Sequence, residues 1–286
     1  MNLPSTDPDT PHPPAETSKG EGTHPSSASG TGCERVLVAI ATYNELATLP
    51  ELVRQVREIV PGADVLIVDD NSPDGTGDWV ARQASLDSRI MGIHRPGKLG
   101  LGTATLASLR YAMEHDYTYV VALDADGSHD PKYIPSLLNA IRRPGEDAPD
   151  MVIGSRYVAG GGTLGWPLHR RVMSRAVNWL ARTMLGLPVR DCSGAFRCTR
   201  VDLLRHLDFD SFRSQGYSLF EELLWRCKHA SARFEEVPIV FSDRSEGQSK
   251  ISARESLGAI WMLMRLGIEN WTRASKHRLA GHRRIS

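Results

Sequence analysis

Two carboxylates stand one residue apart where an apolar run ends. Asp124 and Asp126 follow the strand-like stretch Tyr119–Leu123 in the segment VALDADGSHD (121–130). In an extended backbone, residues i and i+2 point the same way, with Cα atoms about 6–7 Å apart. Two anions placed in this way either hold a divalent cation or repel one another at a cost in free energy. Oxygen-only ligands suit Mg²⁺ or Mn²⁺, and Mg²⁺ usually keeps waters and binds substrate phosphates.

The same pattern is also typical of a strand end followed by an Asp-rich turn, so on its own it leaves both interpretations open. A second acidic pair, Asp69 and Asp70, follows the apolar run DVLIV (64–68). In parallel α/β sheets, ligands bind outside the carboxyl ends of the strands. The two pairs are therefore expected at one edge of a sheet.

Strand and helix patterns alternate along the chain, which predicts an α/β fold with a mainly parallel sheet covered by helices on both faces. Asn44 is placed to cap the first helix and Pro131 to begin a later one. Stretches 160–171 and 242–252 are expected to be loops. Strands are predicted over 36–41, 64–68, 90–94, 117–123, 150–155 and 232–241, and helices over 46–60, just after 75, and over 103–116, 172–185 and 220–230.

The two ends of the chain differ in composition from the middle. Residues 1–32 are rich in Pro, Ser, Thr and Gly, with almost no large apolar side chain, and are predicted to be disordered. Residues 33–252 are predicted to form the folded domain. Residues 253–286 combine a short apolar stretch with a basic tail and are predicted to be an amphipathic segment.

The bulk composition excludes several classes of protein. Lys plus Arg is 34 and Asp plus Glu is 34, a zero balance that argues against nucleic-acid binding. The four cysteines form no CxxC pair, so disulfides and zinc are not expected. No apolar run reaches the roughly 20 residues of a membrane span, and no signal-peptide pattern is present. These features predict a cytosolic protein.

Several longer motifs carry a family resemblance over about residues 35 to 265. Their order resembles that of family 2 glycosyltransferases with the nucleotide-sugar-binding (GT-A) fold, and most closely the dolichyl-phosphate mannose synthases and their bacterial polyprenyl-phosphate counterparts. SPDGT and KLGLGTA together point to the polyprenyl-phosphate branch. The matching pieces are ATYNE (41–45), VDDNSPDGT (68–76), RPGKLGLGTA (95–104), DADGSHDPK (124–132), GSRY (154–157), GWPLHRRVMS (165–174), CSGAFR (192–197) and DRSEGQSK (243–250).

The resemblance implies a donor site. By spacing alone, Glu45 is typical of a first-turn acid favoured by the helix dipole; the resemblance instead assigns it to the nucleotide. Asp69 ranks below Asp70 as a binding residue. The implied nucleotide-binding residues are Ala41, Tyr43, Glu45, Val68 and Asp70; the implied diphosphate and metal residues are Asp124, Ala125, Asp126 and Ser128, with positive charge from Arg156, Arg244 and Lys250.

The resemblance also implies an acceptor-phosphate site at Arg156, Arg170 and Ser174. The last two are four apart and share a helix face. Asp124, Asp126, Arg244 and Lys250 are the implied catalytic residues, and the Gly- and Ser-containing loop that carries the last two is expected to close as a lid. Surface charge in solvent is the ordinary alternative for each arginine and lysine.

The chain departs from the family at several positions. Ala41 stands where the family usually has Pro, and Ser128 stands where some relatives have Gln. The QxxRW motif of processive synthases is absent, which favours transfer of a single sugar. Many bacterial relatives carry C-terminal transmembrane helices, for which this chain shows no pattern.

The predicted reaction is inverting transfer of mannose from GDP-mannose to a polyprenyl phosphate, with Mg²⁺ or Mn²⁺, at the cytoplasmic face of a membrane. The segments 172–185 and 256–268 are candidates for membrane contact or for core packing, and a separate anchoring subunit is a further expectation. Three alternatives remain: a polyprenyl-phosphate glucosyltransferase that uses UDP-glucose, a non-catalytic nucleotide-sugar-binding protein, and a dinucleotide oxidoreductase suggested faintly by the glycines of PGKLGLGT.

Overall fold

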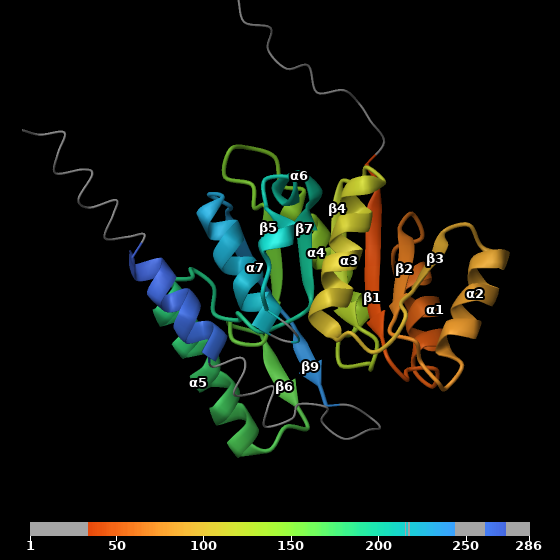
Figure 1. The fold of residues 1–286 in the computed structure, drawn as a ribbon, viewed down its shortest axis with the longest axis horizontal. Helices are drawn as coiled ribbons and strands as arrows, with labels where there is room; N and C mark the ends of the chain where they lie inside the picture. The colour runs from red at the N-terminus through yellow and green to blue at the C-terminus, as the bar shows by residue number, and fades with distance from the viewer. Residues whose placement is uncertain (1–33, 215, 217, 244–260, 273–286) are drawn as a thin grey trace, which may run out of the picture. The chain divides into compact units, whose positions relative to one another are not determined.

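A seven-stranded sheet lies at the centre of the chain (Figure 1), in the order β3-β2-β1-β4-β7-β5-β8, and a second sheet pairs β6 with β9. The structure is a computed structural model that describes residues 34–214, 216, 218–243 and 261–272. The strands are β1 (Val36–Thr42), β2 (Asp64–Asp69), β3 (Ile90–His94), β4 (Tyr119–Asp124), β5 (Met151–Ser155), β6 (Gly162–Leu164), β7 (Arg197–Arg200), β8 (Phe234–Pro238) and β9 (Val240–Ser242).

Helices cover both faces of the large sheet, as predicted. Along β1, side chains alternate between two cores: Leu37 and Ala39 pack with α3 and α7, whereas Val38 and Ile40 pack with α1 and α4. This period of two follows from the pleat of the strand. The helices are α1 (Leu49–Ile59), α2 (Thr76–Leu86), α3 (Leu101–Glu114), α4 (Ile134–Ile141), α5 (Leu168–Leu185), α6 (Val201–Leu204) and α7 (Ser218–His229), with 3-10 turns η1 (Pro131–Tyr133) and η2 (Phe209–Ser211).

The register of the central strands aligns their carboxyl ends. Ala41 of β1 lies opposite Val68 of β2 on one side and opposite Asp124 of β4 on the other. Thr42 lies opposite Asp69. The sheet is thus mainly parallel, and both acidic pairs emerge from its carboxyl edge, as the sequence predicts.

Three local predictions were wrong. The stretch 232–241 is not one strand: it divides at Ile239 into β8 in the large sheet and β9 in the small one. The expected loop 160–171 contains β6 and the start of α5. Asn44 does not cap α1; its backbone is left-handed, with φ of 58°, and Thr48 takes the N-cap position without a side-chain capping hydrogen bond. Asn adopts this conformation more readily than most residues do, so it serves here as a turn.

β7 was not anticipated at all. It runs antiparallel between β4 and β5 and carries the sequence RCTR, which lacks the apolar run of a buried strand. Its cysteine, Cys198, is a free thiol, as are Cys192 and Cys227, and all three are buried.

Residues 261–272 form a helix that lies beside α5 (Figure 1). The Asn270 amide donates to the Met184 carbonyl of α5 over 3.3 Å. Met262, Leu263 and Leu266 are buried. Within the part of the chain that the structure describes, no helix is both long and apolar enough to cross a membrane. The predicted disordered segment 1–32 and the rest of 253–286 lie outside the described residues.

We predict that adding one methyl group at Gly92 of β3 destabilises the fold through a single contact. A Cβ there would stand 2.6 Å from Cγ1 of Val80, a stiff and fully buried side chain of α2. Gly92→Ala should cost about 1–3 kcal/mol in urea unfolding, as overpacking does. Val80→Ala in the same chain should relieve the clash, so the double variant should be less destabilised than the sum of the two single variants.

Gly62→Ala is the matched control, because a Cβ at Gly62 meets no atom within 4 Å. If Gly92→Ala and Val80→Ala proved additive, overpacking between β3 and α2 would not be the cause.

Candidate active site

The loops after β1 and β2 are tied together along the carboxyl edge of the sheet. The backbone N–H of Asn44 donates to the Ser72 hydroxyl over 2.9 Å, and that of Glu45 donates to the Thr76 hydroxyl over 3.2 Å. The Leu46 N–H donates to the Asp74 carboxylate over 3.0 Å. The ATYNE and NSPDGT motifs therefore form one surface, although their bonded partners are 28 or more positions apart in the sequence.

Asp70 holds a third loop against this surface. Its carboxylate forms a buried ion pair with Nε of Arg95 at 3.0 Å and accepts the Gly100 N–H over 2.8 Å. In the same loop, the Lys98 ammonium stands 4.3 Å from the centre of the Tyr43 ring. Tyr43 and Asp70, both predicted to bind the nucleotide, are thus brought together with residues 95–100, and their nucleotide contacts stay predictions.

Asp69 is a satisfied turn residue. It is buried and accepts from the Thr42 and Ser72 hydroxyls over 3.0 and 2.5 Å and from the Ser72 N–H over 3.0 Å. This agrees with its lower rank beside Asp70.

The loop after β4 places Asp124, Asp126 and Ser128 at the centre of the edge. Thr48 at the start of α1 donates to the Ala125 carbonyl over 2.8 Å. Asp126 is buried, and one of its oxygens accepts the Ser128 N–H over 3.0 Å. The Ser128 hydroxyl is also buried and has no hydrogen-bond partner among the described residues.

His129 fixes this loop as a neutral ring. Burial lowers the pKa of His129 to about 4, and its Nδ1 accepts the Asp124 N–H over 3.0 Å. A ring that is neutral near pH 7 makes no ion pair, so its 3.6 Å approach to the Asp124 carboxylate is a polar contact only. His129 is therefore a structural residue.

The donors at this point suit a hard divalent cation. The carboxylates of Asp124 and Asp126 and the Ser128 hydroxyl are oxygen ligands of the kind that Mg²⁺ and Mn²⁺ take. In the described ranges, no group of three or more His, Cys, Asp or Glu side chains is placed to hold a metal. The residues present thus fit a cation that takes its remaining ligands from water and phosphate.

An aromatic cluster of His129, Trp166, Phe196 and Phe241 links this loop to the arginines. The ring of His129 packs against Phe196 and Phe241, each at 5.1 Å between centroids, and Phe241 packs on Trp166 at 5.3 Å. The Arg170 guanidinium covers the Trp166 ring at 4.1 Å. Arg170 is also paired with Asp243 at 2.8 Å, and both side chains are partly exposed.

Arg156 is held more firmly than a residue on a solvated surface. It is buried, and its Nε and Nη2 donate to the two oxygens of Asp191 over 2.7 and 2.6 Å. Nη2 also donates to the Ser193 hydroxyl over 2.9 Å. The next residue, Tyr157, bonds the Ser174 hydroxyl over 2.7 Å. Arg156, Arg170 and Ser174 are thus gathered around Trp166 and Tyr157, as the acceptor prediction requires.

Arg244 and Lys250, and the lid expected to carry them, lie outside the described residues. Sequence reasoning missed four residues at the site: Tyr157, Trp166, Asp191 and Asp243. Tyr157, Trp166 and Asp243 belong to the matched motifs. Asp191 stands one residue before CSGAFR, and no sequence pattern identifies it as the partner of Arg156.

The chain matches the model of the glycosyl transferase family 2 over residues 37–208, more than half of its length. The chain belongs to glycosyltransferase family 2.

Two relatives of this family 2 glycosyltransferase have curated names. The chain is 44% identical over 218 residues to an undecaprenyl-phosphate mannosyltransferase of Micrococcus luteus, covering 76% of this chain and 88% of the relative. It is 37% identical over 256 residues to a polyprenol monophosphomannose synthase of Mycolicibacterium smegmatis, covering 89% and 94%.

Solved structures share the GT-A fold of this glycosyltransferase. The chain is similar to glucosyl-3-phosphoglycerate synthase from Mycobacterium tuberculosis, crystallised with Mn²⁺, uridine diphosphate and phosphoglyceric acid. The TM-score is 0.59 at 19% identity, over 82% of this chain and 79% of the other. The fold prediction is confirmed.

A second buried charge supports the Arg156 side of this glycosyltransferase. Arg197 of β7 donates to the carbonyls of Gly194, Phe220 and Cys192 over 2.7, 2.9 and 2.6 Å.

Burial raises the pKa of the Glu221 carboxyl to about 7, although the nearby positive charge of Arg197 acts to lower it. Oε2 of Glu221 has no hydrogen-bond partner among the described residues.

We predict that Glu221→Gln stabilises the protein more at high pH than at low pH. The folded state binds the Glu221 proton more tightly than the unfolded state does, so ionisation costs stability as the pH rises from about 4.5 to 7. Because Gln carries no charge, the variant should gain about 3 kcal/mol relative to wild type between pH 4.5 and pH 8. Urea unfolding across this range measures the gain. The same change at Glu114, which is exposed on α3, should show no such trend; a pH-independent difference for Glu221→Gln would contradict the prediction.

Proposed function

We propose that the chain transfers mannose from GDP-mannose to a polyprenyl phosphate, with inversion at the anomeric carbon. The observation that carries this proposal is its identity of 44% and 37% to two enzymes named for polyprenyl-phosphate mannose transfer. Each match spans most of both chains. The arrangement of the site supports it, because acidic and basic groups occupy separate places along the carboxyl edge.

The donor would lie on the acidic part. Tyr43, Glu45 and Asp70 would contact guanine and ribose, beside Ala41 and Val68 on the strand ends. Asp124, Asp126 and Ser128 would hold Mg²⁺ or Mn²⁺, which supplies charge neutralisation for the diphosphate when bound. The unpartnered hydroxyl of Ser128 and the buried carboxylate of Asp126 support this assignment.

The acceptor phosphate would lie on the basic part. Arg170 offers a planar fork of donors, and Ser174 offers a hydroxyl already oriented by Tyr157. Arg156 contributes positive charge, although Asp191 already engages two of its nitrogens. A phosphate is anionic at neutral pH, so the site needs to align it rather than to remove a proton.

One in-line displacement by the acceptor oxygen, with GDP leaving, gives a β-linked product. Arg244 and Lys250, which lie outside the described residues, would stabilise the leaving diphosphate, and the loop predicted to carry them would close over it. The QxxRW motif is absent from the sequence, which supports transfer of a single sugar.

The lipid acceptor implies contact with a bilayer, and α5 supports this. Its residues Leu168, Val172, Met173 and Trp179 are 74%, 59%, 62% and 64% exposed. Trp261, Ile268 and Trp271 on the neighbouring helix are also exposed. We infer a protein held peripherally at the cytoplasmic face of a membrane, by these side chains or through a separate anchoring subunit.

We predict that Asp126→Ala abolishes metal-dependent transfer. The assay follows radiolabelled GDP-mannose into organic-extractable lipid, with purified protein, polyprenyl phosphate and Mg²⁺ or Mn²⁺. Removing a residue that supports a bound metal costs about 10–100-fold, and a direct ligand should cost at least as much. Asp210→Ala, at an exposed pair with Arg110, is the control and should keep full activity.

The same assay with UDP-glucose separates the two donors. Labelled glucolipid in place of mannolipid would show that the transferred sugar is glucose. No lipid product with either donor, even after membranes are added, would overturn the proposed function.

We predict that Arg170→Gln raises the KM for polyprenyl phosphate by about tenfold or more and leaves the KM for GDP-mannose unchanged. A hydrogen bond to a charged group contributes about 1.5–3 kcal/mol, and 1.4 kcal/mol is a factor of ten. Arg171→Gln, the next residue on α5, is the matched control. Equal changes in both KM values would show that Arg170 does not act on the acceptor.

A further inference from the structure

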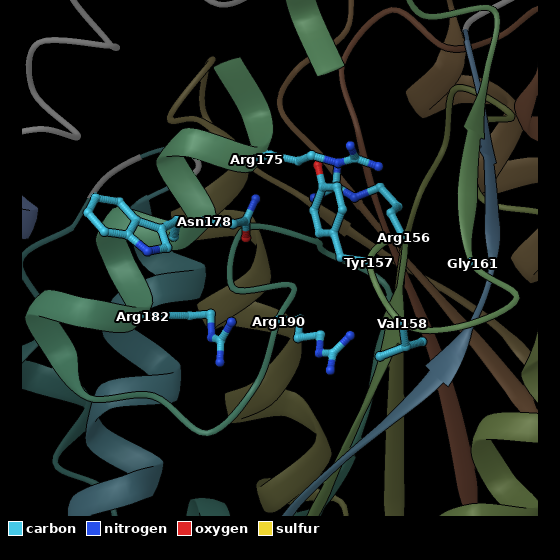
Figure 2. A pocket seen from close by; sticks show the side chains of 9 residues that line it. Arg156, Tyr157, Val158, Gly161, Arg175, Asn178, Arg182 and Arg190 are labelled. Carbon is cyan, nitrogen blue, oxygen red and sulfur yellow. The ribbon is translucent and has the colours of Figure 1, made fainter. Parts of the chain in front are cut away.

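A cavity of about 410 Å³ opens between α5, the loop after β5 and the loop that leads to β7. Four arginines line it: Arg156, Arg175, Arg182 and Arg190. Figure 2 shows Arg182 and Arg190 in its lower part and Arg175, Arg156 and the Tyr157 ring together above them. We call this cavity the arginine pocket.

Three of these guanidinium groups form no ion pair within the described residues, although the backbone N–H of Arg190 donates to the Glu236 carboxylate over 2.8 Å. Arg156 is neutralised by Asp191 at 2.6 Å. For Arg175, Arg182 and Arg190, no carboxylate of the described residues lies within ion-pair distance, and no acidic residue lines the pocket. Converging cations repel one another unless an anion joins them. The pocket therefore favours an anion with several acceptor oxygens.

The arginine pocket is distinct from the place of Arg170. A helix turns about 100° per residue, so Arg170 and Arg175 differ by about 140° around α5. Arg182 follows Arg175 by seven residues and lies almost in line with it. Ser174 and Asn178 face the body of the protein between these two sets, and Asn178 is buried. Arg170 on one side, and Arg175 and Arg182 on the other, thus flank the buried face of α5.

The wall between the two groups is rigid. The Asn178 side chain accepts the Cys192 N–H over 2.6 Å and donates to the Ser174 carbonyl over 2.8 Å. On the other side of the pocket, the loop after β5 folds back closely on the end of that strand at Gly161. A Cβ at Gly161 would stand 2.4 Å from the Ser155 carbonyl oxygen. The walls of the pocket are therefore fixed by contacts within the protein.

Apolar side chains border the pocket on its outer rim. Trp179 lines it and is 64% exposed. Leu168 and Val172 lie within about 20° of Trp179 around the helix and are also exposed. Trp is enriched where protein meets the membrane interface, and Arg near an anionic bilayer is attracted to it. A ligand that is both anionic and apolar matches this combination better than a small ion does.

We propose that the arginine pocket binds the phosphate of an anionic phospholipid, as a second phosphate site beside the one that holds the acceptor. Arg175, Arg182 and Arg190 bind the headgroup, and the acyl chains leave over Trp179. A lipid held there fixes α5 at the bilayer surface and keeps the Arg170 side of the helix at the depth where a lipid-borne phosphate arrives.

The test uses soluble lipids, which present no charged surface. Dihexanoyl phosphatidylglycerol, titrated below its micelle concentration into the full chain, should bind saturably at one site by calorimetry. Zwitterionic dihexanoyl phosphatidylcholine should bind at least about tenfold more weakly. Arg182→Gln and, separately, Arg190→Gln should each lower the affinity for the glycerol lipid by about tenfold or more. Arg82→Gln removes an equally exposed arginine of α2 that has no ion pair in the described chain, and should change nothing.

Two further arms identify the source of the phosphate. Inorganic phosphate that binds as tightly as the glycerol lipid would overturn the assignment to a lipid. Competitive displacement of the glycerol lipid by polyprenyl phosphate would show that the two lipids share one binding site. That result would overturn the proposal of a second phosphate site. Unchanged affinity in both pocket variants would overturn the proposal outright. All arms omit the nucleotide sugar, so they succeed or fail independently of the proposed transfer reaction.

Discussion

The buried pair between Arg156 and Asp191 is the interaction on which the basic side of the site depends. Removing two charges from water costs several kcal/mol per ion, and only good geometry with further hydrogen bonds repays that cost. Here two parallel N–H···O bonds form, and the same carboxylate accepts the Arg156 and Gly194 backbone N–H groups over 3.0 and 3.2 Å. Asp191 is fully buried. The end of β5 and the loop before β7 are thereby joined at one point.

Packed aromatic rings connect the Arg156–Asp191 pair to the acidic side of the site. The Arg156 guanidinium lies 5.6 Å from the Trp166 ring and 5.5 Å from the Phe241 ring. Phe241 packs on His129, whose ring nitrogen accepts the Asp124 N–H. The groups assigned to donor and acceptor therefore belong to one packed unit, so a shift of either side displaces the other. In-line transfer between two phosphate-bearing substrates needs such a fixed separation.

The pattern of strands and acids alone predicts the acidic edge, whereas the family resemblance is what points to Arg156, Arg170 and Ser174, for a physical reason. Parallel strands that end in acids must bring those acids to one edge, so Asp70 and Asp124 can be placed by pattern alone. A buried arginine has no local pattern, because its partner is 35 residues away and a long charged side chain ordinarily lies on the surface. β7 was also missed because it begins with a buried arginine: the Arg197 guanidinium donates to the carbonyls of the nearby Cys192 and Gly194 and to that of Phe220 on α7. Asn44 is an error of another kind, because the sequence pattern assigned it a wrong role. Asn favours helix caps, but it also favours left-handed turns.

α5 combines these constraints in one helix. Surface helices of globular proteins usually turn an apolar stripe at least 100° wide toward the core. In α5, only Asn178, Ala181 and Leu185 of its 18 residues are buried. Five of its large apolar side chains are exposed instead: Leu168, Val172, Met173, Val177 and Trp179. Exposing these apolar side chains to water costs free energy, which favours an apolar environment for them. In the proposed arrangement, the arginines of α5 flank its buried face while its exposed apolar side chains contact the bilayer, and a phosphate carried on a lipid would bind both.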